Sequence, residues 1–295
     1  MYKICCVGHI TLDKVVTTRS TLFMAGGTAF YFSRALQNLD AGYVLVTSVG
    51  ESEMRYVNEL RAKHIEVKAY PSAHTVYFEN IYAENLDHRT QNVLQQADPF
   101  TIEQLSDIDA EIFHLGPLLA GDIPFELVKF LASKSKVSMD AQGYLRKVEN
   151  HKVHPVDWPE KQKTLQYVHT LKADEAEMAV LTGYKEVEQG AKMLADWGVK
   201  EVVITNGSMG SVIYCRGVFY DIPAYLPENV VDATGCGDTY MAGYLYKRSK
   251  GAGIQASGQF AAAMASLKME SPGPFTGTEQ QIIDRISTTK SRGNQ

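Results

Sequence analysis

The sequence predicts an α/β protein with a mostly parallel sheet that is covered by helices on both faces. The main observation is that short apolar runs alternate with helical segments over most of the chain, as they do in β-α-β units. A second observation is that glycine-rich turns lead into helices around Gly26 and around Gly235. The chain has 295 residues, 45% of them hydrophobic, which is enough for one large domain or two smaller ones.

The predicted elements follow one another in a regular order. Runs rich in β-branched, aromatic and aliphatic residues predict strands at Lys3–Val7, Tyr43–Val49, Glu111–Leu115, Lys136–Met139, Tyr167–Leu171, Glu201–Thr205, Ser211–Cys215 and Val218–Ile222. Helical spacing of apolar residues, with caps and glycine stops, predicts helices at Phe30–Leu39, Glu53–His64, Phe125–Ser133, Asp174–Leu181, Glu188–Trp197, Thr239–Leu245, Ile254–Glu270 and Glu279–Ile286.

The segment from about 65 to 95 departs from this alternation. Thr75–Ala83 alternates in polarity and is rich in β-branched and aromatic residues, while the helical signal around it is weak. We expect Glu66–Ala69, Thr75–Ala83 and Gln91–Leu94 to form a small antiparallel sheet, inserted at about 65–95 into a single domain that spans 1–295. A small sheet resting over a site would act as a lid.

Composition excludes several classes of partner. The formal net charge is −5 and no run of Lys or Arg stands out, so neither nucleic acid nor a membrane surface is expected as a partner. The sequence has no apolar stretch of bilayer length, and Met1–Gly8 is too short and strand-like for a signal peptide. The four cysteines have no metal-binding spacing. A reduced, cytoplasmic protein is therefore expected.

The stretch Asn229–Tyr246 holds the clearest chemical signal. Gly235 and Gly237 flank Cys236 just before a predicted helix, and Asp238 follows at once. Backbone N–H groups at such a turn, together with the helix dipole, can hold a phosphate or an oxyanion. A carboxylate at its edge could take a proton from a nearby nucleophile. A tight turn with Asp238 as the helix N-cap explains the same residues, and the residues alone leave both interpretations open.

Other candidate residues also have two interpretations. Asp13 stands near the end of the first strand, where it is either a ligand contact or a turn residue. The Gly26–Gly27 pair permits close approach of a ligand to the backbone, or it is only a turn before a helix. Arg146 closes the polar loop Asp140–Arg146, where it could clamp a phosphate or lie on the surface as a plain arginine.

The first strand also argues against one enzyme class. It is not followed by a G-x-G-x-x-G turn, which disfavours a nicotinamide-dependent dehydrogenase. Farther along, Asp174 and Glu177 have the spacing of a capping box. A structural role as a helix cap is enough to account for both residues. The alternative is that they form a carboxylate pair beside a metal-bound phosphate.

In this order, these motifs resemble the PfkB or ribokinase-like family of small-molecule kinases over essentially the whole chain. Asp232–Asp238 is similar to the D-T-x-G-A-G-D signature, and Gly26–Gly27 to the amino-terminal signature. Asp174–Glu177 is similar to the N-x-x-E magnesium motif, and Thr205–Gly210 to the nucleotide-binding T-x-G-x-x-G turn. The resemblance implies a ribokinase-like three-layer α/β sandwich with a mostly parallel central sheet and a small β-sheet lid.

The resemblance also implies transfer of the γ-phosphoryl of ATP to a hydroxyl of a sugar or polyol. Asp238 would be the base, and the N–H groups of Gly235, Cys236 and Gly237 would form the anion hole. The nucleotide site would be lined by Thr205, Gly207, Gly210 and Asp174, and Glu177 would order Mg²⁺ through water. The acceptor would be held by Asp13, Gly26, Gly27, Tyr31 and Arg146.

Departures from the family pattern bear on cofactor and substrate. Ala233 stands where the family has Thr, which puts the presence of a nearby monovalent-cation site in doubt. Cys236 stands where the family has Ala. Tyr31 stands where many sugar kinases have an Asn that contacts the sugar. That difference argues against a plain ribokinase or fructokinase. Together with Asp140–Arg146, Tyr31 looks more like the inositol-kinase-like branch.

Alternatives remain within the same fold. The ring of Tyr31 could stack on a nucleoside base, so a nucleoside kinase or a vitamin-type, pyridoxine-like kinase is the second hypothesis. A non-catalytic ligand sensor is disfavoured because Asp238 and Glu177 are both present. The expected partners are ATP and a small-molecule alcohol, and the chain is expected to be a monomer or a lid-mediated homodimer.

Overall fold

A large sheet forms the centre of the molecule. The structure is a computed structural model that describes residues 1–18, 20–82 and 89–292. The strand order of the sheet is β15-β14-β13-β12-β9-β8-β1-β4-β5, and the pairs from β5 to β13 are parallel. β14 pairs antiparallel with both of its neighbours, β13 and β15. The strands are β1 (Tyr2–Val7), β4 (Tyr43–Val49), β5 (Glu66–Pro71), β8 (Ala110–Leu115), β9 (Lys136–Asp140), β12 (Thr170–Asp174), β13 (Glu201–Thr205), β14 (Ser211–Cys215) and β15 (Val218–Ile222).

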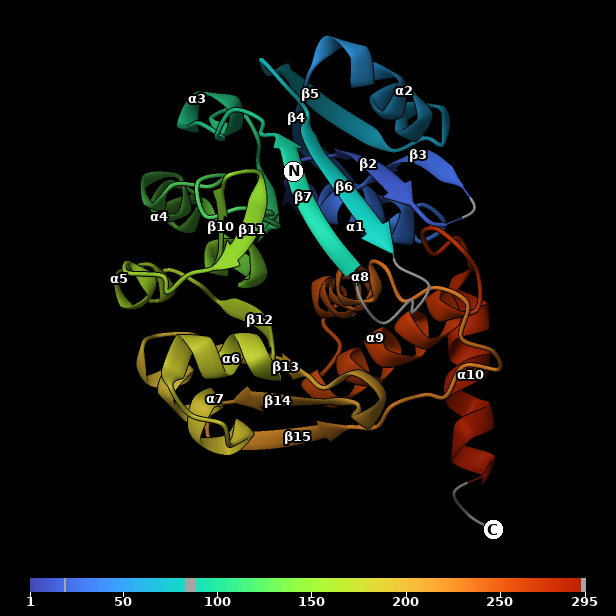
Figure 1. Cartoon of the computed structure of the whole chain (residues 1–295). Coiled ribbons are helices and arrows are strands. Elements are labelled where there is room, and N and C mark those ends of the chain that lie inside the picture. Colours follow the sequence, from blue (N-terminus) through green and yellow to red (C-terminus); the bar gives the residue numbers. More distant parts are fainter. Residues whose placement is uncertain (19, 83–88, 293–295) are drawn as a thin grey trace.

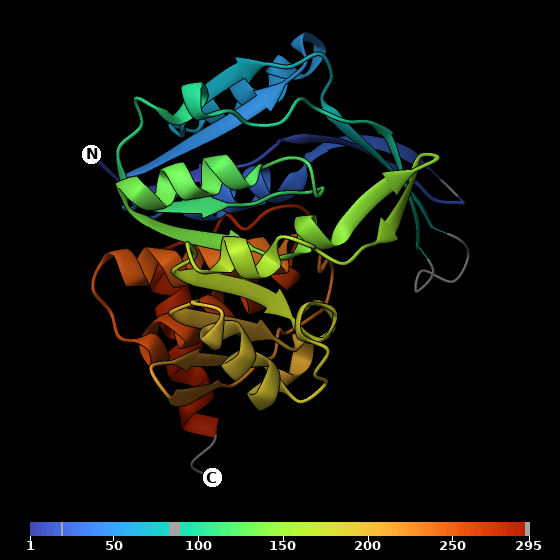
Figure 2. The same cartoon turned by 90° about the vertical axis from the view of Figure 1, so that its left-hand side faces the viewer.

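Helices cover both faces of this sheet, so the body has three layers (Figures 1 and 2). One face is covered by α1 (Gly27–Leu36), α2 (Met54–Ala62), α8 (Cys236–Ser249), α9 (Ile254–Met269) and α10 (Glu279–Arg292). The other is covered by α3 (Ile102–Leu105), α4 (Phe125–Lys134), α5 (Lys161–Leu165), α6 (Glu175–Thr182) and α7 (Val187–Asp196). Neighbouring strand residues serve opposite faces: Cys6 packs into the first core and Cys5 into the second. The predicted fold class is confirmed.

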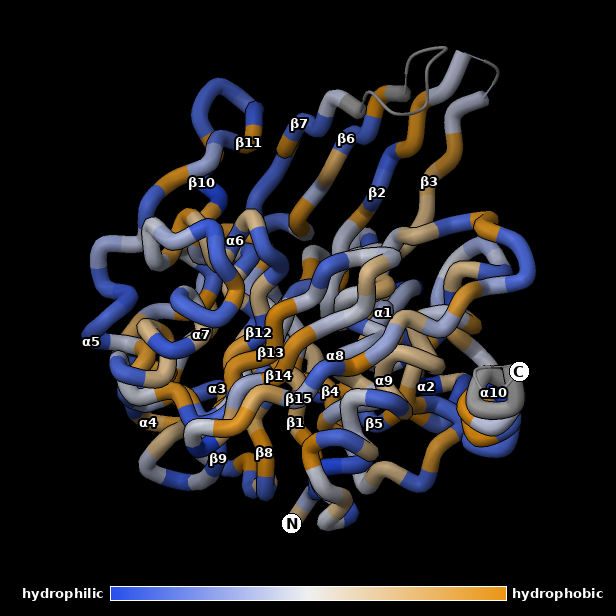
Figure 3. Tube along the Cα trace, turned by 90° about the horizontal axis from the view of Figure 1, so that it is seen from below, coloured by the Kyte–Doolittle hydropathy of each residue, from blue (hydrophilic) through white to orange (hydrophobic). Residues whose placement is uncertain are grey.

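A second, six-stranded sheet has the order β10-β11-β7-β6-β2-β3. Its strands are β2 (Thr11–Val16), β3 (Thr21–Gly26), β6 (Val76–Tyr82), β7 (Arg89–Gln95), β10 (Arg146–Glu149) and β11 (Lys152–Pro155). Figure 3 shows β2, β3, β6 and β7 running out from the body, and we call this sheet the lid. Leu22, Phe23 and Ile81 are exposed on it.

The lid differs from the small antiparallel sheet expected at about 65–95: it also contains β2, β3, β10 and β11, and its β2–β6 pair is parallel. Glu66–Ala69 is not part of it, because α2 returns the chain to the large sheet, where β5 pairs in parallel with β4. Asp13 does not stand at a strand end but inside β2, which leaves the large sheet and pairs with β3 and β6. Of the expected lid segment, residues 83–88 lie outside the described residues.

Smaller departures concern single elements. The strand expected at Tyr167–Leu171 is β12, which begins at Thr170 because Tyr167 and Val168 still belong to the turn after α5. Short 3-10 turns occur at Glu51–Glu53, Gln142–Leu145 and Gly207–Met209. Within the described part of the chain, no helix combines the length and the apolar character needed to cross a membrane.

Candidate active site

The candidate residues gather where parallel strands end. Asp140 ends β9, Asp174 ends β12 and Thr205 ends β13. The register places Lys172 beside Asp140 and Asp174 beside Thr205. The amino terminus of α8 lies against this edge, because a Cβ atom at Gly237 would lie 3.4 Å from the amino nitrogen of Lys172. The parallel sheet thus brings segments far apart in sequence to one point.

The turn before α8 has the shape that the glycines predicted. Gly235 is the N-cap residue, with a left-handed backbone at φ +73°, and Asp238 lies in the first helical turn. The interpretation of Asp238 as an N-cap is therefore wrong, since no side chain caps this helix. Amides of a first helical turn have no partner within their helix, so those of Gly237 and Asp238 can serve an anion. The Cys236 amide, which was predicted to form part of the anion hole, instead donates to the Ala233 carbonyl at 3.3 Å.

Asp238 is the carboxylate with the most distinctive surroundings. Burial, and next the negative charge of Asp140, raise its pKa to about 6. The charges of Lys172 and Arg146 and a hydrogen bond from the Thr28 hydroxyl act in the opposite direction. At neutral pH the group is still mostly ionised, and it is a stronger base than an ordinary aspartate. Its neighbours come from α1, β9, β10 and β12, so the large sheet, the lid and a helix all contribute to its surroundings.

Lys172 is the main positive charge of the site. It is 6% exposed, and its amino group lies 3.1 Å from Asp140 Oδ2 and 3.7 Å from Glu177 Oε2. Burial alone would lower its pKa, but the charges of Asp140 and Glu177 outweigh burial and raise the pKa above its usual value. Lys172 therefore stays protonated, close to the helix start that faces an incoming anion.

Lys172, Asp140 and Thr28 were not among the predicted site residues. A usable signal was present for Lys172, because a lysine inside a strand that is otherwise buried needs a partner. Its partners could not be named from the sequence, since Asp140 reaches it only through the pairing of β9 with β12. For Thr28, the preceding glycine pair indicated the helix start but not which side chain would face Asp238.

Asp174 and Glu177 form the capping box that their spacing predicted. The Asp174 amide donates to Glu177 Oε2 at 2.7 Å, and the Glu177 amide donates to Asp174 Oδ1 at 2.7 Å. Burial, opposed by Lys172 and supported by Asp140, raises the pKa of Glu177. Among the described residues, no group of three or more acidic, cysteine or histidine side chains could enclose a metal ion. Carboxylate oxygens are ligands that suit a magnesium ion, so Asp174 and Glu177 would be the residues that help to hold one beside the donor phosphates.

The glycine pair shapes the acceptor side. A Cβ atom at Gly26 would lie 2.4 Å from Asp13 Oδ2, and one at Gly27 would lie 2.6 Å from the His9 carbonyl oxygen. Gly27 also has φ +83°, so both positions need glycine. The Asp13 carboxylate accepts a hydrogen bond from Thr11 Oγ1 at 2.6 Å. The glycines thus let β2 bring Asp13 against the start of α1.

Tyr31 lies between the predicted acceptor side and the turn before α8. It is 3% exposed, and its ring lies so close to Gly235 that a Cβ atom there would be 2.2 Å from Tyr31 Cδ1. Burial and the carboxylates of Asp232, Asp13 and Asp238, in that order, raise the pKa of Tyr31. The charges of carboxylates from both sides therefore act on one side chain. A contact between Tyr31 and the substrate stays a prediction, while its contact with Gly235 is direct.

The predicted nucleotide turn follows β13. The Asn206 amide donates to the Gly210 carbonyl at 2.8 Å, and Gly207 and Gly210 have φ values of +47° and +100°. A Cβ atom at Gly210 would lie 2.3 Å from the Ile222 carbonyl oxygen, so this position needs glycine. A cavity of about 340 Å³ adjoins the turn and is lined in part by Glu175, Asn206 and Met209.

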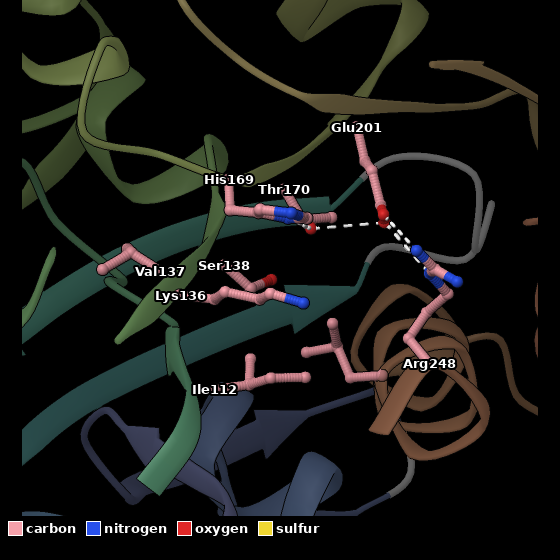
Figure 4. Close-up of a pocket in the computed structure, with 9 residues that line it drawn as sticks. Ile112, Lys136, Val137, Ser138, His169, Thr170, Glu201 and Arg248 are labelled. Atoms are coloured by element: carbon pink, nitrogen blue, oxygen red, sulfur yellow. Dashed lines mark hydrogen bonds and ion pairs between the residues drawn. The ribbon is translucent and has the colours of Figure 1, made fainter. Parts of the chain in front are cut away.

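A different cavity lies at the opposite, amino-terminal edge of the sheet (Figure 4). It is lined by Lys136, Thr170 and Glu201, the first residues of β9, β12 and β13. The buried Glu201 carboxylate is paired there with Arg248 of α8. The volume is about 30 Å³, which suits a water molecule rather than a substrate.

A buried lysine, a glycine turn at a helix start and a basic carboxylate together suit phosphate transfer to a hydroxyl, so fold and site define a small-molecule phosphotransferase. Comparison with known proteins gives the same class. The chain belongs to the pfkB family of carbohydrate kinases, whose family model matches residues 1–281. The predicted family and enzyme class are confirmed.

Individual relatives show how wide this family is. A solved pyrophosphate-dependent kinase in the ribokinase family, complexed with a pyrophosphate analog and myo-inositol, has a TM-score of 0.85 and 28% identity, covering 95% of this chain and 99% of that chain. The cytidine kinase of Thermococcus kodakarensis is 26% identical over 263 residues, 85% of this chain and 90% of the relative. The inositol 3-kinase of Arabidopsis thaliana is 26% identical over 253 residues, 82% of this chain and 67% of the relative.

Proposed function

We propose that this kinase phosphorylates a hydroxyl of a cyclitol, with inositol as the leading candidate. The observation that carries the proposal is the polar character of the acceptor side. The negative charges of Asp13 and Asp238 both act on Tyr31, and the charge of Arg146 acts on Asp238. These groups suit an acceptor with hydroxyls all around its ring. The Tyr31 ring is 3% exposed, so the residue that motivated a nucleoside acceptor offers little surface for stacking. The myo-inositol complex supports the same choice.

The proposed chemistry assigns a role to each part of the site. Asp238 takes the proton of the attacking hydroxyl. Lys172 and the amides at the start of α8 stabilise negative charge on the transferred phosphoryl group. Asp13 and Arg146 orient the acceptor, and the lid excludes water. Magnesium, when bound, would neutralise charge on the donor phosphates, with Glu177 and Asp174 ordering it.

We propose ATP as the donor. The turn Thr205–Gly210 and the cavity of about 340 Å³ beside it offer room for more than phosphate groups. The pyrophosphate-dependent relative makes pyrophosphate the second candidate donor. The two donors share their phosphate chemistry, so only a direct comparison of rates separates them.

The function is tested by initial rates on an acceptor and donor panel. Acceptors are myo-inositol, scyllo-inositol, ribose, fructose, cytidine and pyridoxine, each with magnesium and either ATP or pyrophosphate. We expect an inositol with ATP to give the highest kcat/KM, by at least about tenfold, since unmatched polar groups in a site cost that much or more. A preference for cytidine or pyridoxine would contradict the acceptor class, and turnover with pyrophosphate alone would contradict the donor.

The pKa of Asp238 predicts how activity depends on pH. The carboxylate is the base, and it is lost as pH falls through about 6. We therefore expect kcat/KM to fall about tenfold per pH unit below that value. Asp140 raises this pKa, so Asp140→Asn should move the acid limb to lower pH. Rates measured from pH 4.5 to 8.5 in a constant-ionic-strength buffer test both statements. A limb that stays in place in Asp140→Asn would contradict the electrostatic assignment.

A further inference from the structure

A fully buried lysine lies behind the catalytic turn. Lys268, near the end of α9, is 0% exposed. Its amino group donates to the Asp232 carbonyl oxygen at 2.6 Å and to Asp232 Oδ2 at 2.8 Å, and it lies 5.9 Å from the centre of the Tyr31 ring. Burying an ammonium group is costly unless it is paired and hydrogen-bonded. The free-energy cost of burying the Lys268 ammonium group therefore has to be offset, and Asp232 is its partner.

Asp232 is the point where the turn is fastened to the body. Its carboxylate accepts hydrogen bonds from the Thr234 amide at 2.8 Å and from the Gly273 amide at 3.1 Å. The amides of Val231 and Asp232 donate to the Met269 carbonyl at 2.8 and 3.2 Å. Hydrogen bonds from Lys268 and Thr234 outweigh burial and hold the pKa of Asp232 below its usual value. The segment that enters the turn is thus tied to the carboxyl end of α9.

We propose that the Lys268 ammonium is a built-in cation that holds the catalytic turn Asp232–Gly237 in shape, so that phosphoryl transfer by this chain needs no monovalent cation. The oxygen atoms of Asp232 decide whether a monovalent cation can bind near Ala233. Both a backbone carbonyl and a carboxylate oxygen, the donors that a free cation would use, are already bound by Lys268. A free cation does not fit in the same place.

The arrangement has a mechanical consequence for catalysis. Lys268 fixes the start of the turn from α9, and the Tyr31 ring packs on Gly235 from α1. The two contacts hold Asp232 and Gly235, and the first amides of α8 and Asp238 follow directly after Gly235. Lys268 is therefore a positioning residue, and its loss should lower kcat more than it raises the KM for either substrate.

The first test uses the wild-type enzyme. This inference rests on the proposed phosphoryl transfer, so rates are measured with whichever acceptor and donor the panel selects. Chloride salts of lithium, sodium, potassium, ammonium and tetramethylammonium are compared at constant ionic strength. We expect the same kcat in all of them. Activation of the wild-type enzyme by potassium or ammonium over tetramethylammonium would overturn the inference.

The second test removes the tethered cation. In Lys268→Ala we expect kcat to fall about 10- to 10²-fold, since a 1 Å displacement of a catalytic group can cost about that much. The small side chain leaves space, so potassium or ammonium should restore part of kcat and raise Tm, whereas tetramethylammonium is too large to enter. In Lys268→Met the space is filled, and no salt should restore activity. Equal responses of the two variants to potassium would contradict the inference.

The control variant is Lys247→Met, and Tm is a readout that does not depend on turnover. Lys247 of α8 pairs with Glu279 at 3.4 Å and lies 5.1 Å from the centre of the Phe260 ring, so Lys247→Met removes a cation that joins helices away from the turn. It should change neither kcat nor the response to salts. The Tm readout needs no turnover: wild type should be indifferent to potassium and Lys268→Ala stabilised by it. If no acceptor in the panel reacts, the proposed function fails, while Tm still tests this inference.

Discussion

Replacing Asp238 by asparagine should lower kcat by about 10²- to 10⁴-fold, the contribution typical of a general base. Asparagine keeps the shape of the side chain and can still accept the Thr28 hydrogen bond, but it cannot take a proton. Donor affinity should change little, because the amides of the α8 turn and Lys172 remain in place. The measurement is kcat with both substrates saturating, together with donor binding by calorimetry.

The matched control for this prediction is Asp196→Asn. Asp196 is an exposed carboxylate at the end of α7, so its change to asparagine alters net charge equally without touching the site. Its kcat should equal that of the wild type. An Asp238→Asn enzyme whose kcat stays within about tenfold of wild type would remove Asp238 from the role of base, since general-base losses start at about 10².

Replacing Gly235 by alanine should reduce kcat by about 10² or more, comparable with the loss of a preorganised donor to developing negative charge. The added Cβ atom would lie 2.2 Å from Tyr31 Cδ1 and 2.3 Å from Cγ. The ring is 3% exposed and cannot swing away, so the turn itself must move. The first amides of α8 would then be displaced. Steady-state kinetics and Tm measure the effect.

Gly251 supplies a matched control for the backbone strain. It has φ +81°, close to the +73° of Gly235, but a Cβ atom there would meet nothing within 4 Å. Gly251→Ala therefore bears only the cost of a left-handed alanine, about 1–2 kcal/mol. The double variant Tyr31→Ala/Gly235→Ala removes the clash and should recover part of kcat. Equal activity of Gly235→Ala and Gly251→Ala would show that the contact with Tyr31 has no catalytic effect.

Local patterns were sufficient for the body of the fold. Continuous apolar strands and helices that end at glycine predicted the elements around Gly183 and Gly198, because these signals depend only on neighbouring residues. The lid was harder to predict. Glu66–Pro71 alternates in burial in the same way as a lid strand, and only its pairing with β4 places it in the large sheet. The β2–β3 pair lacks the Asn-Gly or Asp-Gly turn that marks a hairpin.

Those parts of the site were predictable in which all the contacting residues belong to one sequence motif. The capping box is such a case, since its two hydrogen bonds join residues three positions apart, and the backbone turn at Gly235 is another. The contacts that tune Asp238 join α1, β9 and β12 to α8, and no spacing in the sequence encodes them. The contact of Tyr31 with Gly235 and that of Lys268 with Asp232 also arise only when α1, α8 and α9 pack together.

The most direct test of the proposed phosphoryl transfer, with Asp238 as the base, is to identify the product by phosphorus NMR. Wild-type protein and Asp238→Asn are incubated side by side with myo-inositol, magnesium and ATP. We expect a new phosphomonoester signal that couples to an inositol ring proton, formed in step with ADP by the wild type and nearly absent with the variant. Formation of ADP together with free phosphate only, or an ester signal of equal intensity from both proteins, would contradict this proposal.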